Sequence, residues 1–169
     1  MSLPNPESVY ACLRDQIDKA FPDRSALGLI GVHSGGAWIA ERLHRDLGFR
    51  LPCGFLDSSF YRDDFSERGL KNAPKAAEMP FEVEGQHIVL VDDVLYTGRT
   101  TRAIVNHLFD FGRPAKIELA VLLDRGGREL PIAAQYVGMH WPLKHQESFV
   151  LTQDDLGAFG LDLEVRASE

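Results

Sequence analysis

Residues 87–101 read HIVLVDDVLYTGRTT, and this stretch decides the fold. Its apolar run at residues 88–91 predicts a strand that is buried on both faces, as in a parallel sheet with helices on either side. The strand leads into two adjacent carboxylates, Asp92 and Asp93. Residues 97–101 follow as a glycine- and hydroxyl-rich turn that opens a helix. The stretch therefore predicts a strand–turn–helix unit of an α/β fold.

The turn at residues 97–101 has the chemistry of a phosphate site. Unpaired backbone N–H groups and the positive end of the helix dipole favour an anion at a helix N-terminus. Asp92 and Asp93 are expected at the carboxyl edge of the sheet, where open α/β folds bind ligands. The combination predicts a sugar phosphate site, with the acids on the ribose hydroxyls and the turn on the phosphate. The plainer alternative is a strand end with solvated acids, followed by a Thr N-cap.

Outside this unit, apolar runs alternate with segments of helical periodicity. The expected helices cover about residues 6–21, 37–47 and 99–111, and the expected strands cover about residues 27–32, 54–61 and 117–123. This order predicts a parallel sheet covered on both sides. Residues 62–80 form a long polar stretch, which in a small domain is usually functional or mobile. After Arg125 the pattern changes to short strands and turns, which predicts a small flap over the carboxyl edge of the sheet.

The composition is that of one ordinary globular domain. Of the 169 residues, 44% are hydrophobic and 25% are charged. A net charge of −7 argues against a protein that binds nucleic acid through a broad basic surface. No apolar stretch approaches the roughly 20 residues that cross a bilayer, and no secretion signal is visible. Cys12 and Cys53 match no disulfide framework or metal-ligand spacing, so we expect a cytoplasmic protein with reduced thiols.

The stretch at 87–101 resembles the phosphoribosyl pyrophosphate signature of type I phosphoribosyltransferases, in which an apolar strand leads into two acids and a threonine-glycine phosphate loop. Two further segments, LDSSFYRDDFS at 56–66 and GRPAKIELAVLLDRGGRELPI at 112–132, resemble the pyrimidine-operon attenuator/uracil phosphoribosyltransferase (PyrR-type) family. The resemblance implies the type I phosphoribosyltransferase fold in a single domain. A parallel sheet flanked by helices would form the core at about 22–125. A small hood over its carboxyl edge would comprise about 126–169 and the N-terminal helix.

Members of this family convert uracil and phosphoribosyl pyrophosphate to UMP and pyrophosphate, and some bind the leader RNA of pyrimidine genes. The resemblance implies that Asp92 and Asp93 accept hydrogen bonds from the ribose 2′- and 3′-hydroxyls. The stretch at 62–80 is expected to act as a lid, and Arg62 is the candidate that closes onto the pyrophosphate. The alternative is an exposed loop arginine that pairs with Asp63 or Asp64. The residues implied to hold the 5′-phosphate are Tyr96, Thr97, Gly98, Arg99, Thr100 and Thr101. The residues implied for the pyrophosphate are Ser34, Gly35 and Gly36, and those for the base are Arg125, Tyr136 and Val137, with Arg128 as a further candidate. Mg²⁺ is expected to arrive on the substrate's phosphates, without direct protein ligands.

Two departures from the family pattern bear on these roles. Family members commonly carry a Thr-Arg pair in the pyrophosphate loop, where this chain has Ser34-Gly35. The loop therefore lacks a cation, unless His33 or a lid arginine replaces it. RNA-binding relatives carry basic residues at the positions matching Ala133 and Met139, which are uncharged here. Because phosphate contacts supply most sequence-independent RNA affinity, we expect weak RNA binding.

The leading hypothesis is a Mg²⁺-dependent uracil phosphoribosyltransferase that forms a homodimer or a larger homo-oligomer. One alternative is a UMP-sensing, RNA-binding attenuation regulator with weak or vestigial catalysis. Another is a phosphoribosyltransferase that acts on purine bases. A dinucleotide-binding protein is disfavoured, because the first strand runs into GVHSGG at 31–36 and not into G-x-G-x-x-G.

Overall fold

A five-stranded parallel sheet forms the centre of the molecule. The computed structural model describes residues 2–59 and 75–166. In their spatial order the strands are β2 (Gly54–Leu56), β1 (Leu27–Val32), β3 (His87–Leu95), β4 (Lys116–Asp124) and β5 (Tyr136–His140). Every neighbouring pair is parallel. The α/β class and the parallel sheet predicted from the sequence are confirmed.

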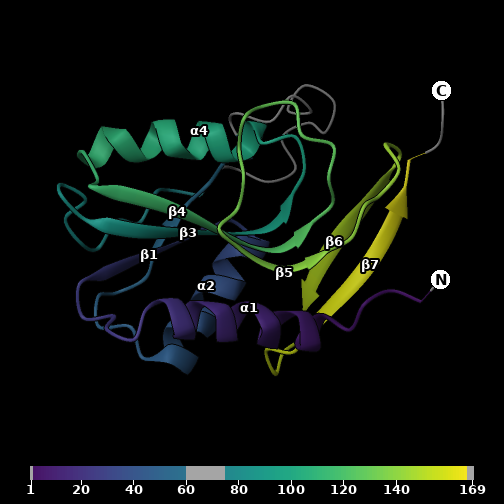
Figure 1. Cartoon of the computed structure of the whole chain (residues 1–169), viewed down its shortest axis with the longest axis horizontal. Helices are drawn as coiled ribbons and strands as arrows, with labels where there is room; N and C mark the ends of the chain where they lie inside the picture. Colours follow the sequence, from purple (N-terminus) through teal and green to yellow (C-terminus); the bar gives the residue numbers. More distant parts are fainter. Residues whose placement is uncertain (1, 60–74, 167–169) are drawn as a thin grey trace.

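Helices cover both faces of this sheet. They are α1 (Pro6–Ala20), α2 (Gly35–Leu47), α4 (Arg99–Leu108) and the short 3₁₀ helix η2 (Phe109–Phe111). Figure 1 shows α1 and α2 on one face and α4 on the other. Val89 and Val91 of β3 pack in the cluster with α1 and α2, whereas Ile88 and Leu90 pack in the cluster with α4. This two-sided burial explains why β3 has a continuous apolar run.

Local signals set the ends of the first two helices. The Asn5 side chain caps α1 by accepting the N–H groups of Glu7 and Ser8, at 2.9 and 3.2 Å. Pro6 occupies the first turn, where a missing N–H costs nothing. α2 ends at Gly48, whose φ of 66° lies in the left-handed region. Of the helices in the described part of the chain, none combines the length and the apolar character of a membrane span.

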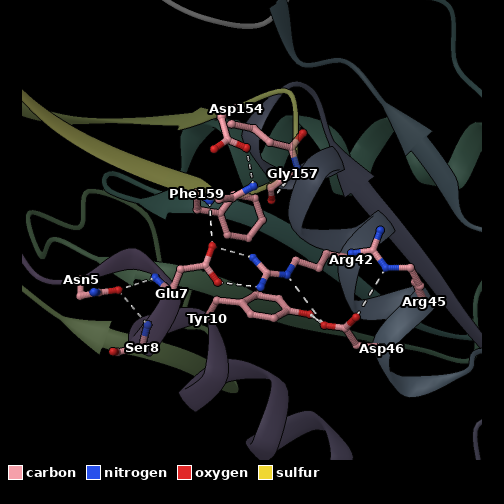
Figure 2. A network of polar contacts seen from close by, with 12 residues as sticks. Asn5, Glu7, Ser8, Tyr10, Arg42, Arg45, Asp46, Asp154, Gly157 and Phe159 are labelled. Carbon is pink, nitrogen blue, oxygen red and sulfur yellow. Dashed lines mark hydrogen bonds and ion pairs between the residues drawn. The ribbon is translucent and has the colours of Figure 1, made fainter.

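A two-stranded antiparallel sheet stands beside the parallel one (Figure 1). Its strands are β6 (Glu147–Gln153) and β7 (Phe159–Val165). Arg42 of α2 joins this hairpin to the helices, as Figure 2 shows. Arg42 donates two hydrogen bonds to Glu7 of α1, at 2.8 and 2.6 Å, and its guanidinium carbon lies 4.9 Å from the ring centroid of Phe159. Glu7 also accepts the Phe159 N–H at 2.8 Å, so α1, α2 and β7 share one contact.

Two strands differ from the expectation. The strand expected at 54–61 ends at Leu56, because the Asp57 carboxylate accepts the Ser59 N–H at 2.9 Å and turns the chain. Residues 60 and 61 lie outside the described part. β5 joins the parallel sheet, although the chain beyond Arg125 was expected to form only a flap. As a partly exposed edge strand, β5 lacks the continuous apolar run by which β1 and β3 are recognised.

Candidate active site

Two helix N-termini reach the carboxyl edge of the sheet beside β3. β1 leads into α2 through His33 and Ser34, which are joined by a cis peptide bond, and β3 leads into α4 through residues 96–98. Because β1 and β3 are neighbours, the two loops lie next to each other. The first N–H groups of a helix have no partner within the helix, and its dipole is positive there. Both loops therefore favour anions.

Asp92 and Asp93 both lie within β3, which continues to Leu95. Side chains alternate along a strand, so the two carboxylates belong to opposite faces of the sheet. Asp92 is 6% exposed and borders a cavity of about 100 Å³ at the start of α4. Asp93 borders an adjoining cavity of about 1200 Å³, which we call the main cavity. That both acids bind the hydroxyls of one ribose stays a prediction. The structure adds that the two residues line adjoining cavities.

The main cavity collects most of the residues predicted to bind the substrate. Of those predicted for the two phosphate sites, Ser34, Gly35, Tyr96, Thr97, Arg99 and Thr100 line it. Asp93 and Arg125 line it as well. Gly98 and Thr101 border the small cavity with Asp92. The structure thus brings the sequence-predicted phosphate loops and acids to one edge of the sheet.

Glycine at positions 35 and 36 is required by close packing at the start of α2. A β-carbon on Gly35 would lie 2.8 Å from Cγ of Asp93. A β-carbon on Gly36 would lie 2.9 Å from Cα of Asp92 and still closer to the Val91 carbonyl oxygen. Distances this short exclude a side chain unless β3 or the Asp93 carboxylate moves. The helix start is therefore held directly against the acidic end of β3.

The turn before α4 is built around Gly98, whose φ of 93° lies in the left-handed region. Thr97 Oγ1 accepts the Arg99 N–H at 3.2 Å. The Thr97 carbonyl oxygen accepts the N–H groups of Glu129 and Leu130, at 3.0 and 3.1 Å. The Arg99 side chain donates to Glu129 at 2.9 Å. The segment that follows β4 therefore holds this turn in place.

Arg125 is buried in the wall of the main cavity. It is 5% exposed, and its guanidinium carbon lies 3.9 Å from the centroid of the Tyr96 ring. Its Nη2 donates to the Lys144 carbonyl oxygen at 2.8 Å. Burial lowers the pKa of Arg125, although an arginine stays charged at neutral pH. A ligand in the main cavity would meet this residue, and its assignment to the base stays a prediction.

Arg128 is a positioning residue. It donates to Asp124 Oδ2 at 2.7 Å and to the Ile132 carbonyl oxygen at 2.8 Å, and it also donates to the Tyr96 carbonyl oxygen. These bonds tie the end of β4 to the turn before α4. Because its charge is paired with Asp124, Arg128 is poorly placed to bind a base or RNA.

Tyr136 and Val137, predicted to bind the base, lie away from the main cavity. They begin β5 and pair with Ala120 and Val121 of β4. β5 runs parallel to β4, so its first residues lie far from the edge at which β4 ends. The backbone N–H and C=O of Val137 bond to the Gln16 side chain of α1, at 3.3 and 2.7 Å. The backbone of Val137 is therefore already engaged, and this geometry gives no support to its predicted role.

Sequence reasoning missed several residues that line the main cavity. They include Trp38, Asp57, Lys75, residues 145–151 and Arg166. Asp57 lies within the segment 56–66 that carries the family resemblance, but no role was assigned to it. No motif marks the others, because they reach the cavity from separate loops, from α2 and from the hairpin. Arg62, predicted to close onto the pyrophosphate, lies outside the described residues.

Comparison with known proteins places these features in a family. The chain matches the phosphoribosyl transferase domain family over residues 11–153. It is 47% identical over 149 residues to the bifunctional protein PyrR of Pseudomonas aeruginosa, a match that covers 87% of this chain and 88% of that protein. It is 54% identical over 128 residues to the bifunctional protein PyrR of Ralstonia nicotianae, with coverages of 76% and 73%.

Solved structures share the fold. A hypoxanthine-guanine phosphoribosyltransferase from Bacillus anthracis aligns with a TM-score of 0.66 at 23% identity, over 84% of each chain. The enzyme from Leishmania tarentolae aligns with a TM-score of 0.62 at 21% identity, over 85% of this chain and 82% of that one. At these identities the likeness shows the fold alone, and it confirms the predicted type I phosphoribosyltransferase fold. Sequence and fold together lead to one conclusion: the chain belongs to the phosphoribosyl transferase domain family and, within it, to the group of the bifunctional PyrR proteins.

Proposed function

We propose that this protein is a Mg²⁺-dependent uracil phosphoribosyltransferase, which converts uracil and phosphoribosyl pyrophosphate to UMP and pyrophosphate. The observation that carries the proposal is the acidic end of β3, placed between two glycine-bearing helix starts. The resemblance to uracil phosphoribosyltransferases and the PyrR relatives support uracil as the base. This arrangement can hold an anion at each end of a sugar.

The reaction breaks the bond between C1′ and the pyrophosphate oxygen, and positive charge develops on the ribose. In this proposal the carboxylates of Asp92 and Asp93 accept hydrogen bonds from the ribose hydroxyls, and their negative charge stabilises the developing positive charge. The N–H groups at the start of α2 receive the departing pyrophosphate, and those at the start of α4 hold the 5′-phosphate. The protein therefore fixes both ends of the substrate while the acids act on its middle.

The donors of the main cavity fit a magnesium ion that is carried by the substrate. Asp57 and Asp93 both line the cavity and offer carboxylate oxygens, the donor type that Mg²⁺ prefers. Mg²⁺ usually keeps several waters and binds through one or two carboxylates together with substrate phosphates. When bound, it would supply positive charge that offsets the charge of the pyrophosphate.

The base is best accommodated between Tyr96, Arg125 and the hairpin. The guanidinium of Arg125 stacks on the Tyr96 ring, and the His145 ring centroid lies 6.5 Å from that of Tyr96. Aromatic and guanidinium faces suit a planar base. Residues 145–151 line the same cavity, so the β6–β7 hairpin and the segment before it would serve as the flap that covers the base.

The test is a uracil-dependent release of pyrophosphate by the purified protein. Wild-type protein should release pyrophosphate from uracil and phosphoribosyl pyrophosphate and should form UMP, and removal of Mg²⁺ with a chelator should stop the reaction. An Asp92→Asn, Asp93→Asn double variant should be inactive. The matched control is Asp110→Asn, since Asp110 is exposed and lies in η2, outside both cavities. Absence of uracil-dependent release at saturating substrates would remove the proposal.

The purine alternative needs assays with different bases. Uracil, hypoxanthine and guanine should be compared at equal concentrations of phosphoribosyl pyrophosphate. Uracil is expected to give the fastest transfer. A purine that outcompetes uracil would replace the proposed substrate and leave the reaction type intact.

A regulatory role at pyrimidine-gene RNA is the second candidate function, because the PyrR relatives are named bifunctional. Ala133 and Met139 add no positive charge, and Arg128 is paired with Asp124. We therefore expect RNA binding to be weak and to need low salt. A filter-binding titration with pyrimidine leader RNA, with and without UMP, tests it. The absence of UMP-dependent binding would exclude this role.

A further inference from the structure

The pyrophosphate loop at residues 33–36 contains no lysine or arginine, although its proposed ligand carries several negative charges. We propose that Lys75 supplies this cation from outside the loop and binds the pyrophosphate group of phosphoribosyl pyrophosphate. The inference rests on the proposed function and names a residue that the sequence motifs did not indicate.

The site has a specific need for a cation. Asp57 and Asp93 line the main cavity and would repel the pyrophosphate charge that a bound Mg²⁺ leaves uncompensated. Position 35, where family members commonly carry arginine, is glycine in this chain and supplies no charge. His33 also lines the cavity, but burial lowers its pKa and the nearby charge of Lys75 lowers it further. His33 is therefore neutral at neutral pH and does not supply the charge.

The backbone around Lys75 is fixed next to the pyrophosphate loop. Asp57 Oδ2 accepts the Lys75 N–H at 2.8 Å, immediately after β2. Phe55 and Glu78 exchange two backbone hydrogen bonds, at 2.8 and 2.9 Å, which hold the returning chain beside β2. β2 is the neighbour of β1, and β1 leads directly into His33. The sheet order thus sets Lys75 on the pyrophosphate side of the site.

The Lys75 side chain is available for a ligand. It is exposed and lines the main cavity. Among residues 2–59 and 75–166, no carboxylate forms an ion pair with its ammonium group. Lys75 lines this cavity together with His33, Ser34 and Gly35 of the pyrophosphate loop.

The other cations of the main cavity are held elsewhere. Arg99 pairs with Glu129, at 2.9 Å, beside the start of α4. Arg125 follows β4, on the opposite side of β3 from β1, and its guanidinium stacks on Tyr96. The Arg166 N–H donates to the Gln146 carbonyl oxygen at 2.8 Å, next to His145, whose ring packs near that of Tyr96. Arg166 therefore belongs to the Arg125 side of the cavity. Of the described cations, Lys75 is the one placed beside residues 33–36.

The experiment compares Lys75→Met with Lys75→Arg and with the control Lys19→Met. Lys19 is an exposed lysine in the last turn of α1 and does not line the main cavity. Loss of one charge-assisted hydrogen bond corresponds to roughly 10- to 100-fold in affinity. Lys75→Met should raise the KM for phosphoribosyl pyrophosphate by about that factor and leave the KM for uracil within about 2-fold. Lys75→Arg should retain most of the affinity, and Lys19→Met should behave as wild type.

A binding measurement separates this inference from the proposed function. Calorimetric titration with magnesium pyrophosphate should show the same loss of affinity in Lys75→Met, whether or not the protein turns over uracil. Unchanged pyrophosphate affinity and unchanged KM in Lys75→Met would overturn the role of Lys75, while UMP formation by wild type would still support the enzyme. Wild-type protein that binds pyrophosphate through Lys75 but forms no UMP would overturn the proposed function alone. Unfolding curves of all variants should coincide, because the Lys75 side chain has no structural partner among the described residues.

Discussion

Asp92 and Asp93 are consecutive residues whose carboxylates border different cavities, one beside the start of α4 and the other facing the pyrophosphate loop. This division predicts different effects for the two single variants. Asp92→Asn should weaken UMP binding more than Asp93→Asn does, because the Asp92 carboxylate would hold the ribose hydroxyls on the side of the 5′-phosphate turn, whereas Asp93 faces the pyrophosphate loop. Asp93→Asn should lower kcat/KM for phosphoribosyl pyrophosphate by roughly 10- to 100-fold. Calorimetry with UMP and steady-state kinetics measure the two effects, and equal losses of UMP affinity would contradict the division.

A β-carbon at position 36 is predicted to damage the site and the fold together. Gly36→Ala must push the start of α2 away from β3, since the new methyl group would meet the Val91 carbonyl and Asp92. Overpacking of this kind costs about 1–3 kcal/mol, and the upper end is expected here because the nearest atoms are backbone atoms. The control Gly85→Ala meets no atom within 4 Å and carries only the cost of its φ of 68°, about 1 kcal/mol. Urea unfolding of both variants checks the difference, and a Gly36→Ala protein as stable as Gly85→Ala would show that the helix start can shift freely.

The contact between Glu7 and Arg42 is predicted to contribute to stability without contacting a substrate. Glu7→Gln keeps the size of the side chain and removes the charge that receives two hydrogen bonds from Arg42. We expect a loss of about 1 kcal/mol in the free energy of unfolding, because the pair is partly exposed. Arg14→Met serves as the control, since Arg14 pairs with its exposed neighbour Asp15 and its loss should change stability by less than about 0.5 kcal/mol. A Glu7→Gln protein that matches this control would contradict the prediction.

The Glu7 carboxylate is also expected to make the free energy of unfolding depend on pH, in a direction that its pKa sets. Hydrogen bonds from Arg42 hold the pKa of Glu7 below its ordinary value of 4.5. A carboxyl group whose pKa is lower in the folded state stabilises the protein at pH values above its unfolded-state pKa. This stabilisation is lost as the pH falls through the folded-state pKa. Between about pH 7 and about pH 3, wild-type protein should therefore lose more stability than Glu7→Gln. Unfolding curves at both pH values test this, and equal losses would show that Glu7 titrates alike in both states.

Local sequence was enough to predict the central strands and the two glycine-bearing turns. β3 and β4 each contain a continuous apolar run, at residues 88–91 and 119–123, because both faces of the sheet are covered. Gly98 marks a turn that needs a left-handed backbone. The same reasoning failed at β5, which is an edge strand with partial exposure. It also extended β2 past Leu56, because the hydrogen bond from Ser59 to Asp57 that turns the chain is not visible in a pattern of apolar residues.

The site was predictable only where one motif supplies neighbouring residues. The acids and the turn before α4 come from a single stretch, so their proximity follows from the sequence. Lys75 and the residues at 145–151 meet that stretch through the order of strands and the placement of the hairpin. Tyr136 was predicted to bind the base, but it begins β5 and so lies at the end of the strand that is distant from the carboxyl edge of the sheet.

The contact among Glu7, Arg42 and Phe159 spans 152 residues of chain. A ribosome therefore makes Glu7 and Arg42 early and Phe159 only after every strand of the parallel sheet has been translated. Until then the surface of α1 and α2 that Phe159 covers stays exposed, so the packing of the first helix is completed only when the β6–β7 hairpin has been made.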